Sequence, residues 1–141
     1  MTTRPRVLVL CTGNKARSQM AEGWIRHFGR GRLDVVSAGT RPSGVWQLVI
    51  EAMSEAGVDI STQWSKSVNE FTGQEFDYVV TLCNDAKEGC PVFPGARRTL
   101  HVPFLDPWLP PERRHEEPVL VRRIRDEIRD WAQGFVAEVL A

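Results

Sequence analysis

The chain has 141 residues, 42% of them hydrophobic and 26% charged, which is enough to bury one core and too little for two. Eighteen basic residues balance eighteen acidic ones, so the net charge is zero and there is no overall basic field to attract nucleic acid or an acidic membrane. No apolar run is long enough to cross a bilayer or to act as a signal peptide. We therefore expect a single cytoplasmic domain over residues 1–141, in which any anion site is local.

The first half of the chain alternates strand and helix patterns. Residues 7–10 are a short apolar run, typical of a parallel strand buried on both faces. Apolar residues at helical spacing follow, from Met20 to Phe28, and Gly29 ends that pattern. We expect a second strand over residues 33–37 and a second helix over residues 45–56.

The second half continues this order with weaker signals. We expect a third strand over residues 78–82 and a shorter fourth strand over residues 99–102. Five prolines between residues 103 and 118 predict a long irregular loop. Apolar residues three or four apart from Leu120 to Val139 then predict an amphipathic helix. The chain is thus predicted to be an α/β protein with three layers, in which helices flank a four-stranded parallel sheet.

The loop after the first strand carries the strongest chemical signal. Residues 11–18 read CTGNKARS and join a buried strand to a helix, at the sheet edge where ligands usually bind. The loop contains residue types that tolerate left-handed backbone, so it can curl and turn its N–H groups toward a tetrahedral oxyanion. A guanidinium at its end can clamp two oxygens of the ligand. We predict an oxyanion site, the cradle, formed by Thr12, Gly13, Asn14, Lys15, Ala16 and Arg17.

Cys11 stands at the end of the strand, just before the cradle. The positive end of the following helix and the Arg17 guanidinium both favour its thiolate form. Ser18 is placed to donate a hydrogen bond to that thiolate. The alternative is a buried structural cysteine near a surface arginine, but the agreement of strand, loop and helix favours a reactive thiolate.

Segments distributed along nearly the whole chain resemble the thioredoxin-coupled arsenate reductases, which share the low-molecular-weight phosphotyrosine phosphatase fold. The resemblance is carried by residues 11–14 (CTGN), 16–24 (ARSQMAEGW), 37–40 (SAGT), 51–53 (EAM), 59–61 (DIS), 80–83 (VTLC), 90–95 (CPVFPG) and 106–107 (DP). A cysteine and an arginine separated by five residues also occur in the phosphatases. The resemblance to a reductase therefore depends on Cys83 and Cys90.

The resemblance implies a mechanism with three thiols. Cys11 would attack arsenate, Cys83 would attack the Cys11 adduct and release arsenite, and Cys90 would then attack Cys83. Thioredoxin would reduce the final disulfide, with no bound cofactor. Asp106 matches the residue that protonates the leaving group in the phosphatases. Sulfate or phosphate would mimic arsenate in the cradle.

The spacing of Cys83 and Cys90 has a mechanical consequence. If the residues between them form a helix, the rise of about 10.5 Å exceeds the roughly 4.4 to 6.8 Å between disulfide-linked Cα atoms. The helix would have to unwind for a disulfide to form, and Gly89 and Pro91 would weaken it. The alternative is a buried structural Cys83 and an idle Cys90. Three thiols without a close pair of histidines match no common zinc site, so we expect no metal.

Two lysines depart from the pattern of the relatives. Lys15 replaces a small hydroxyl residue, where its charge either favours anions or points to solvent. Lys66 replaces an acidic residue that, in some relatives, helps to bind a potassium ion together with the positions of Asn14, Glu22 and Ser37. We therefore predict no potassium requirement, because the Lys66 ammonium can take the place of the ion.

Two tryptophans support an alternative function. Trp46 stands where the reductases usually have a polar residue, and Trp108 follows Asp106-Pro107. Aromatic walls hold the phosphotyrosine ring in phosphatases, so a phosphatase that uses Cys11, Arg17 and Asp106 is the first alternative. The second alternative is a non-catalytic oxyanion-binding or redox-sensing module. Glutaredoxin or a small thiol could also replace thioredoxin as the electron donor, and we expect a monomer.

Overall fold

The computed structural model describes residues 4–83 and 92–141. Its four strands form one sheet in the order β2-β1-β3-β4, and all three pairings are parallel. The strands are β1 (Arg6–Cys11), β2 (Asp34–Gly39), β3 (Phe76–Thr81) and β4 (Ala96–His101). The four residues Val7 to Leu10 of β1 have no exposed surface. This burial on both faces explains their unbroken apolar sequence.

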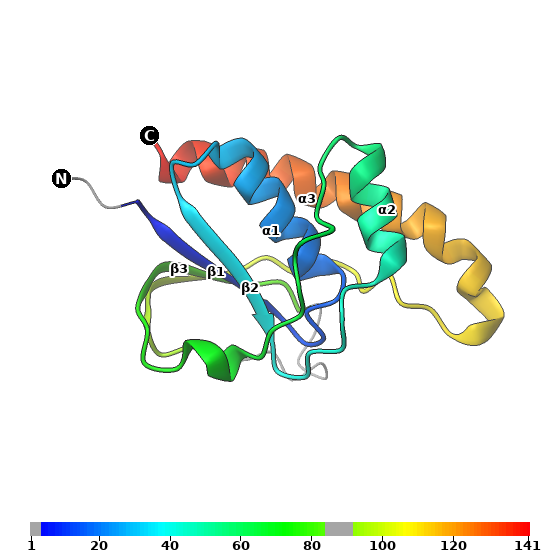
Figure 1. The fold of residues 1–141 in the computed structure, drawn as a ribbon, viewed down its shortest axis with the longest axis horizontal. Helices are drawn as coiled ribbons and strands as arrows, with labels where there is room; N and C mark the ends of the chain where they lie inside the picture. The colour runs from blue at the N-terminus through cyan, green and yellow to red at the C-terminus, as the bar shows by residue number, and fades with distance from the viewer. Residues whose placement is uncertain (1–3, 84–91) are drawn as a thin grey trace.

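Three α-helices share one hydrophobic core with one face of the sheet. They are α1 (Arg17–Gly29), α2 (Gln47–Glu55) and α3 (Glu117–Val139). The long α3 runs across the molecule, and both shorter helices pack against it (Figure 1). The predicted apolar stripe of α3 faces this core, where Ile124 and Ile128 are fully buried.

A second, smaller core lies on the opposite face of the sheet. Leu8, Leu10 and Val79 pack there with Phe93 and with residues of η1 (Val68–Phe71), a short 3-10 helix. The predicted layered α/β architecture is confirmed. In the part of the chain that the structure describes, this third layer consists of η1 and the loops around it.

The predicted element boundaries need correction in several places. The loop predicted over residues 103–118 contains a 3-10 helix, η3 (Pro111–Glu116), and α3 already begins at Glu117. Proline is compatible with the first turn of a helix, because its missing N–H has no helical partner there. β4 begins three residues earlier than predicted, since it is an edge strand whose Arg97 and Arg98 face solvent and break the apolar pattern. β2 and β3 are each shifted by one or two residues from their predicted ranges.

Two cysteine-bearing segments lie together at the carboxyl ends of neighbouring strands. Cys11 is the last residue of β1, and Leu82 and Cys83 directly follow β3, which is the neighbouring strand. The amide of Leu82 donates to the carbonyl of Leu10 at 2.9 Å, so the two strand ends stay paired up to the start of the cradle. Among the described residues, no helix is both long enough and apolar enough to cross a membrane.

Candidate active site

A pocket of about 270 Å³ opens at the carboxyl end of β1. It contains seven residues predicted from the sequence to form the site and two further residues. Its lining consists of Cys11, Thr12, Gly13, Lys15, Ala16, Arg17, Ser43, Asp106 and Trp108.

The cradle curls at Asn14, which has a left-handed backbone with φ of 47°. Gly13 is not among the described residues with positive φ, so the turn depends on an asparagine. The Asn14 side chain is fully buried behind the cradle rather than in the pocket. It donates to Ser18 and Ser37 at 2.9 Å each and accepts from the amide of Lys66 at 2.7 Å.

The carbonyl groups of residues 12–15 are all held by hydrogen bonds from outside the cradle. Their donors are the amides of Arg41, Ser43 and Trp46 and the side chain of Gln19, at 2.9 to 3.1 Å. In a trans peptide the N–H points opposite to the preceding C=O. The amides of residues 13–16 are therefore turned toward the pocket, where they can bind an oxyanion together with the N-terminus of α1.

Ser18 contacts the predicted nucleophile directly. Its Oγ lies 2.9 Å from Sγ of Cys11, which is only 2% exposed. Because Ser18 Oγ already accepts a hydrogen bond from Asn14, its own hydrogen is available to Cys11. A charged sulfur at this position would thus have a neutral donor within hydrogen-bond distance.

Arg17 is held between two segments that are distant in sequence. Its Nη1 donates to the carbonyl of Phe104 at 3.1 Å and to that of Leu82 at 3.4 Å. Its Nη2 lies 3.7 Å from Oδ2 of Asp106, whose side chain is 46% exposed. Arg17 thus joins the cradle to the loop carrying Asp106 and to the residue before Cys83.

Cys83 is fully buried at the end of β3, beside the strand that carries Cys11. Cys90 lies outside the described residues, and so does the helix predicted between the two cysteines. The structure therefore brings Cys11, Arg17, Ser18 and Asp106 together and places Cys83 next to this group.

A buried polar network lies behind the cradle, at the positions that the sequence resemblance linked to potassium binding. Lys66 Nζ is 3.6 Å from Oε1 of Glu22 and donates to the Trp64 carbonyl at 2.8 Å. Ser37 donates to the same Glu22 oxygen at 2.6 Å. The Lys66 ammonium therefore contacts the buried carboxylate that a cation would need to neutralise. In the described ranges, no group of three or more histidine, cysteine or acidic residues is arranged to hold a metal.

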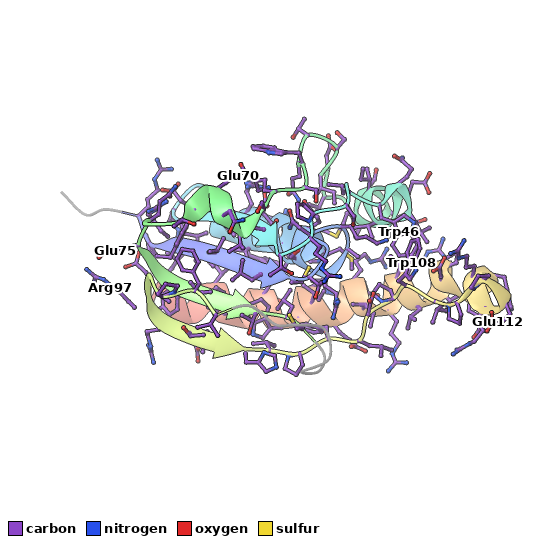
Figure 2. The ribbon with its side chains drawn as sticks, turned by 90° about the horizontal axis from the view of Figure 1, so that it is seen from below. Trp46, Glu70, Glu75, Arg97, Trp108 and Glu112 are labelled. Carbon is purple, nitrogen blue, oxygen red and sulfur yellow. The ribbon has the colours of Figure 1, made fainter. Side chains whose placement is uncertain are left out.

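The two tryptophans noted in the sequence meet at the mouth of the pocket. The rings of Trp46 and Trp108 are 5.2 Å apart in an edge-to-face arrangement (Figure 2). Lys15 does not simply point to solvent, since its Nζ lies 3.3 Å from the centre of the Trp108 ring. Burial lowers the pKa of Lys15; Asp106 and Glu117 act in the opposite direction.

Two residues near the pocket were missed by sequence reasoning. Ser43 lines the pocket from the turn after β2. Glu117 is buried at the start of α3, and its Oε2 accepts from the amide of Leu109 at 2.8 Å, which ties the loop of Asp106 to the helix. An acidic residue beside Pro118 is a known mark of a helix start, but nothing in the sequence indicates its loop partner.

The chain matches the low molecular weight phosphotyrosine protein phosphatase family over residues 6–139. It is 42% identical to an arsenate reductase of Halalkalibacterium halodurans, over 92% of this chain and 93% of that protein. A solved structure described as an arsenate reductase in the phosphate binding state superposes with a TM-score of 0.81, at 28% identity, and covers 96% of this chain and 98% of that one.

The thioredoxin-dependent arsenate reductase of Corynebacterium glutamicum has a TM-score of 0.73 at 28% identity. The match covers 99% of this chain and 63% of that longer one. Family, sequence relatives and structures thus agree over nearly the full length described above. The chain therefore belongs to the low molecular weight phosphotyrosine protein phosphatase family and, within it, to the arsenate reductases.

Proposed function

We propose that this protein reduces arsenate to arsenite by passing oxidation through three thiols. The observation that carries the proposal is the placement of Cys83. It lies two residues after the end of β3, the strand that pairs with the strand of Cys11, and the carbonyl just before it accepts a hydrogen bond from Arg17. A phosphatase needs the cradle, Cys11 and an acid, and hydrolysis of a phosphate ester consumes no second thiol.

The first step is an attack of the Cys11 thiolate on arsenic. The cradle amides and Arg17 hold three arsenate oxygens, and the fourth leaves as water after taking a proton from Asp106. This step forms a sulfur–arsenic bond and leaves arsenic pentavalent. Two observations support this step: the short contact between Ser18 and Cys11, and the presence of Asp106 in the lining of the same pocket as Cys11.

The second step transfers the electrons. The Cys83 thiolate attacks Cys11 Sγ and forms a disulfide, while the electron pair of the sulfur–arsenic bond stays on arsenic. Trivalent arsenite then leaves. Cys90 attacks Cys83, which restores the Cys11 thiolate and produces a Cys83–Cys90 disulfide for reduction from outside.

The electron donor in this proposal is thioredoxin, and no bound cofactor takes part. The name of the Corynebacterium relative, a thioredoxin-dependent enzyme, supports this choice. The phosphate-bound relative supports phosphate, and by the same chemistry sulfate, as a mimic of arsenate. We further propose that the protein acts as a monomer in the cytoplasm, where thiols are kept reduced.

The proposal is tested by arsenate-dependent NADPH consumption with thioredoxin and thioredoxin reductase. The wild type should turn over repeatedly, and Cys11→Ser should be inactive. Cys83→Ser and Cys90→Ser should stop repeated arsenate reduction but keep residual hydrolysis of an aryl phosphate, which needs neither Cys83 nor Cys90. Repeated turnover by Cys90→Ser would show that the third step is wrong. Mass spectrometry after one turnover should find the Cys83–Cys90 disulfide.

A second candidate is a protein tyrosine phosphatase, in which the tryptophan pair at the pocket mouth would stack on the ring of a phosphotyrosine. The same three variants separate the two functions. Fast aryl phosphate hydrolysis that is insensitive to Cys83→Ser, together with no reduction of arsenate, would establish the phosphatase. If neither reaction occurs, the protein is a binding or sensing module.

A further inference from the structure

Lys15 is the residue of the cradle whose side chain reaches the aromatic wall. Its Nζ lies 3.3 Å from the centre of the Trp108 ring and 5.7 Å from that of Trp46. Both distances are within the range of cation–π attraction. The edge-to-face contact between the two rings fixes their orientation, so the lysine is held at the pocket rather than free in solvent.

The Trp108 ring carries a second cation. The guanidinium carbon of Arg114, from η3, lies 5.1 Å from the centre of the same ring. An aryl group entering the pocket would need aromatic surface on which to stack, yet this ring already has two cationic partners. An aryl phosphate would therefore have to displace an ammonium group from its contact.

An inorganic oxyanion meets a different environment. All of its oxygens are free of ester groups and can carry negative charge, and the pocket offers Lys15 in addition to Arg17. Lys15 and Arg17 are the basic residues of the pocket lining and Asp106 is the acidic one, so the positive charges in the lining outnumber the negative. An aryl ester would place an uncharged ring near Lys15, whereas a free anion would place a charged oxygen there.

We propose that Lys15, held over Trp108, determines substrate specificity by selecting free inorganic oxyanions over aryl phosphate esters. The inference rests on the proposed reduction of arsenate, because it assigns the substrate class of the same pocket. It also gives the aromatic pair a different role from the phosphotyrosine wall predicted as the alternative: the rings hold a lysine.

The test compares binding of inorganic phosphate and phenyl phosphate through protection of Cys11 from iodoacetamide, followed by mass spectrometry of its peptide. Because protection needs no turnover, failure of arsenate reduction would contradict the proposed function and leave this measurement intact. Lys15→Met keeps the length of the side chain and removes its charge. Lys15→Arg keeps the charge and can still stack on Trp108.

We expect Lys15→Met to shift the ratio of the two dissociation constants by about tenfold toward phenyl phosphate, and Lys15→Arg to keep it within about twofold. Trp108→Leu, which retains the lysine but removes the ring that holds it, should shift the ratio in the same direction and by less. An unchanged ratio in Lys15→Met, or an equal shift in Lys15→Arg, overturns the proposal. If Lys15→Met does not fold, an unchanged ratio in Trp108→Leu overturns it.

Discussion

The hydroxyl oxygen of Ser18 lies 2.9 Å from Cys11 Sγ and accepts a hydrogen bond from Asn14 at the same distance. Asn14 is itself fixed by Ser37 and by the amide of Lys66. A chain of buried hydrogen bonds thus runs from the back of the cradle to the nucleophile. Because Ser18 Oγ accepts from Asn14, its hydrogen can point toward the sulfur, where it would stabilise negative charge in the proposed attack on arsenate.

Replacing Ser18 by alanine should therefore slow the attack on arsenate. The Cys11 thiolate loses its side-chain donor, and we expect the single-turnover rate to fall by about 100-fold, as when one donor is removed from an oxyanion hole. Rapid quench with detection of arsenite measures this rate. Ser43→Ala, which changes a serine of the pocket lining rather than the one beside Cys11, should change it far less. Equal losses in the two variants would contradict a specific role for Ser18.

The sequence could predict most of the residues around Cys11, because they lie close together along the chain. Cys11, Ser18 and Arg17 lie on one strand–loop–helix segment, so their spacing alone places them around one loop. The buried β1 was also predictable, since every side chain of residues 7–10 is apolar. Only the resemblance connected Asp106 to this loop, because a lone Asp-Pro pair indicates no more than a turn.

The features that sequence reasoning missed depend on long-range contacts or on an edge position. Glu117 reaches the loop of Asp106 through a hydrogen bond to Leu109, which no local pattern signals. The start of β4 was not predictable from apolar residues, because an edge strand can expose polar residues such as Arg97. The contact between Lys15 and Trp108 joins two separate loops, so no local pattern could decide between the two orientations predicted for Lys15.

Gly39 should not tolerate a side chain. A Cβ atom at this position would lie 2.5 Å from the carbonyl oxygen of Thr12 and 2.9 Å from the amide of Asn14. Both neighbours are cradle backbone and cannot move without distorting the loop. We expect Gly39→Ala to lower the free energy of unfolding by about 1 to 3 kcal/mol and to weaken phosphate binding.

Urea unfolding and phosphate protection of Cys11 measure these two effects. Gly134→Ala is the matched control, because a Cβ there meets nothing within 4 Å. Gly134 lies on the exposed side of α3, where alanine should stabilise the helix by up to about 1 kcal/mol. Normal phosphate binding by Gly39→Ala would show that the cradle backbone can shift to accommodate the added Cβ atom.

Lys66 should make the wild-type enzyme insensitive to potassium. Its ammonium, 3.6 Å from the buried Glu22 carboxylate, supplies the positive charge that a bound ion would provide. We expect equal arsenate reduction when sodium chloride is exchanged for potassium chloride at constant ionic strength. A clear rise in activity with potassium would refute this prediction.

Lys66→Met tests whether a potassium ion can replace the ammonium group beside Glu22. Glu22 keeps contacts with Arg26 at 2.7 Å and Ser37 at 2.6 Å but loses its second cation. We expect the free energy of unfolding to fall by about 1 to 3 kcal/mol, since a buried ion pair is broken while Arg26 still compensates part of the Glu22 charge. Potassium chloride should restore part of this stability, and choline chloride should not. No difference between the two salts would show that a metal ion cannot replace the lysine.

Glu55 should make the contact between α2 and α3 sensitive to acid. Two hydrogen bonds from Arg122, at 3.0 and 3.1 Å, are the main cause of a lowered pKa for this carboxyl group, and Arg125 contributes further. A carboxyl group whose pKa is lower in the folded than in the unfolded protein stabilises the fold above its unfolded pKa. That contribution disappears as the pH falls through the folded pKa.

Arg122→Gln should therefore be less stable than the wild type at neutral pH, and the difference should disappear in acid, once Glu55 is protonated in both proteins. Urea unfolding over a pH series measures this, and high salt should reduce the difference because both side chains are about half exposed. Arg32→Gln removes an equal charge from an exposed turn between α1 and β2 and leaves the partners of Glu55 in place, so its pH profile should parallel that of the wild type. If the difference between Arg122→Gln and the wild type persists in acid, the arginine stabilises the helix pair through packing of its side chain rather than through its charge.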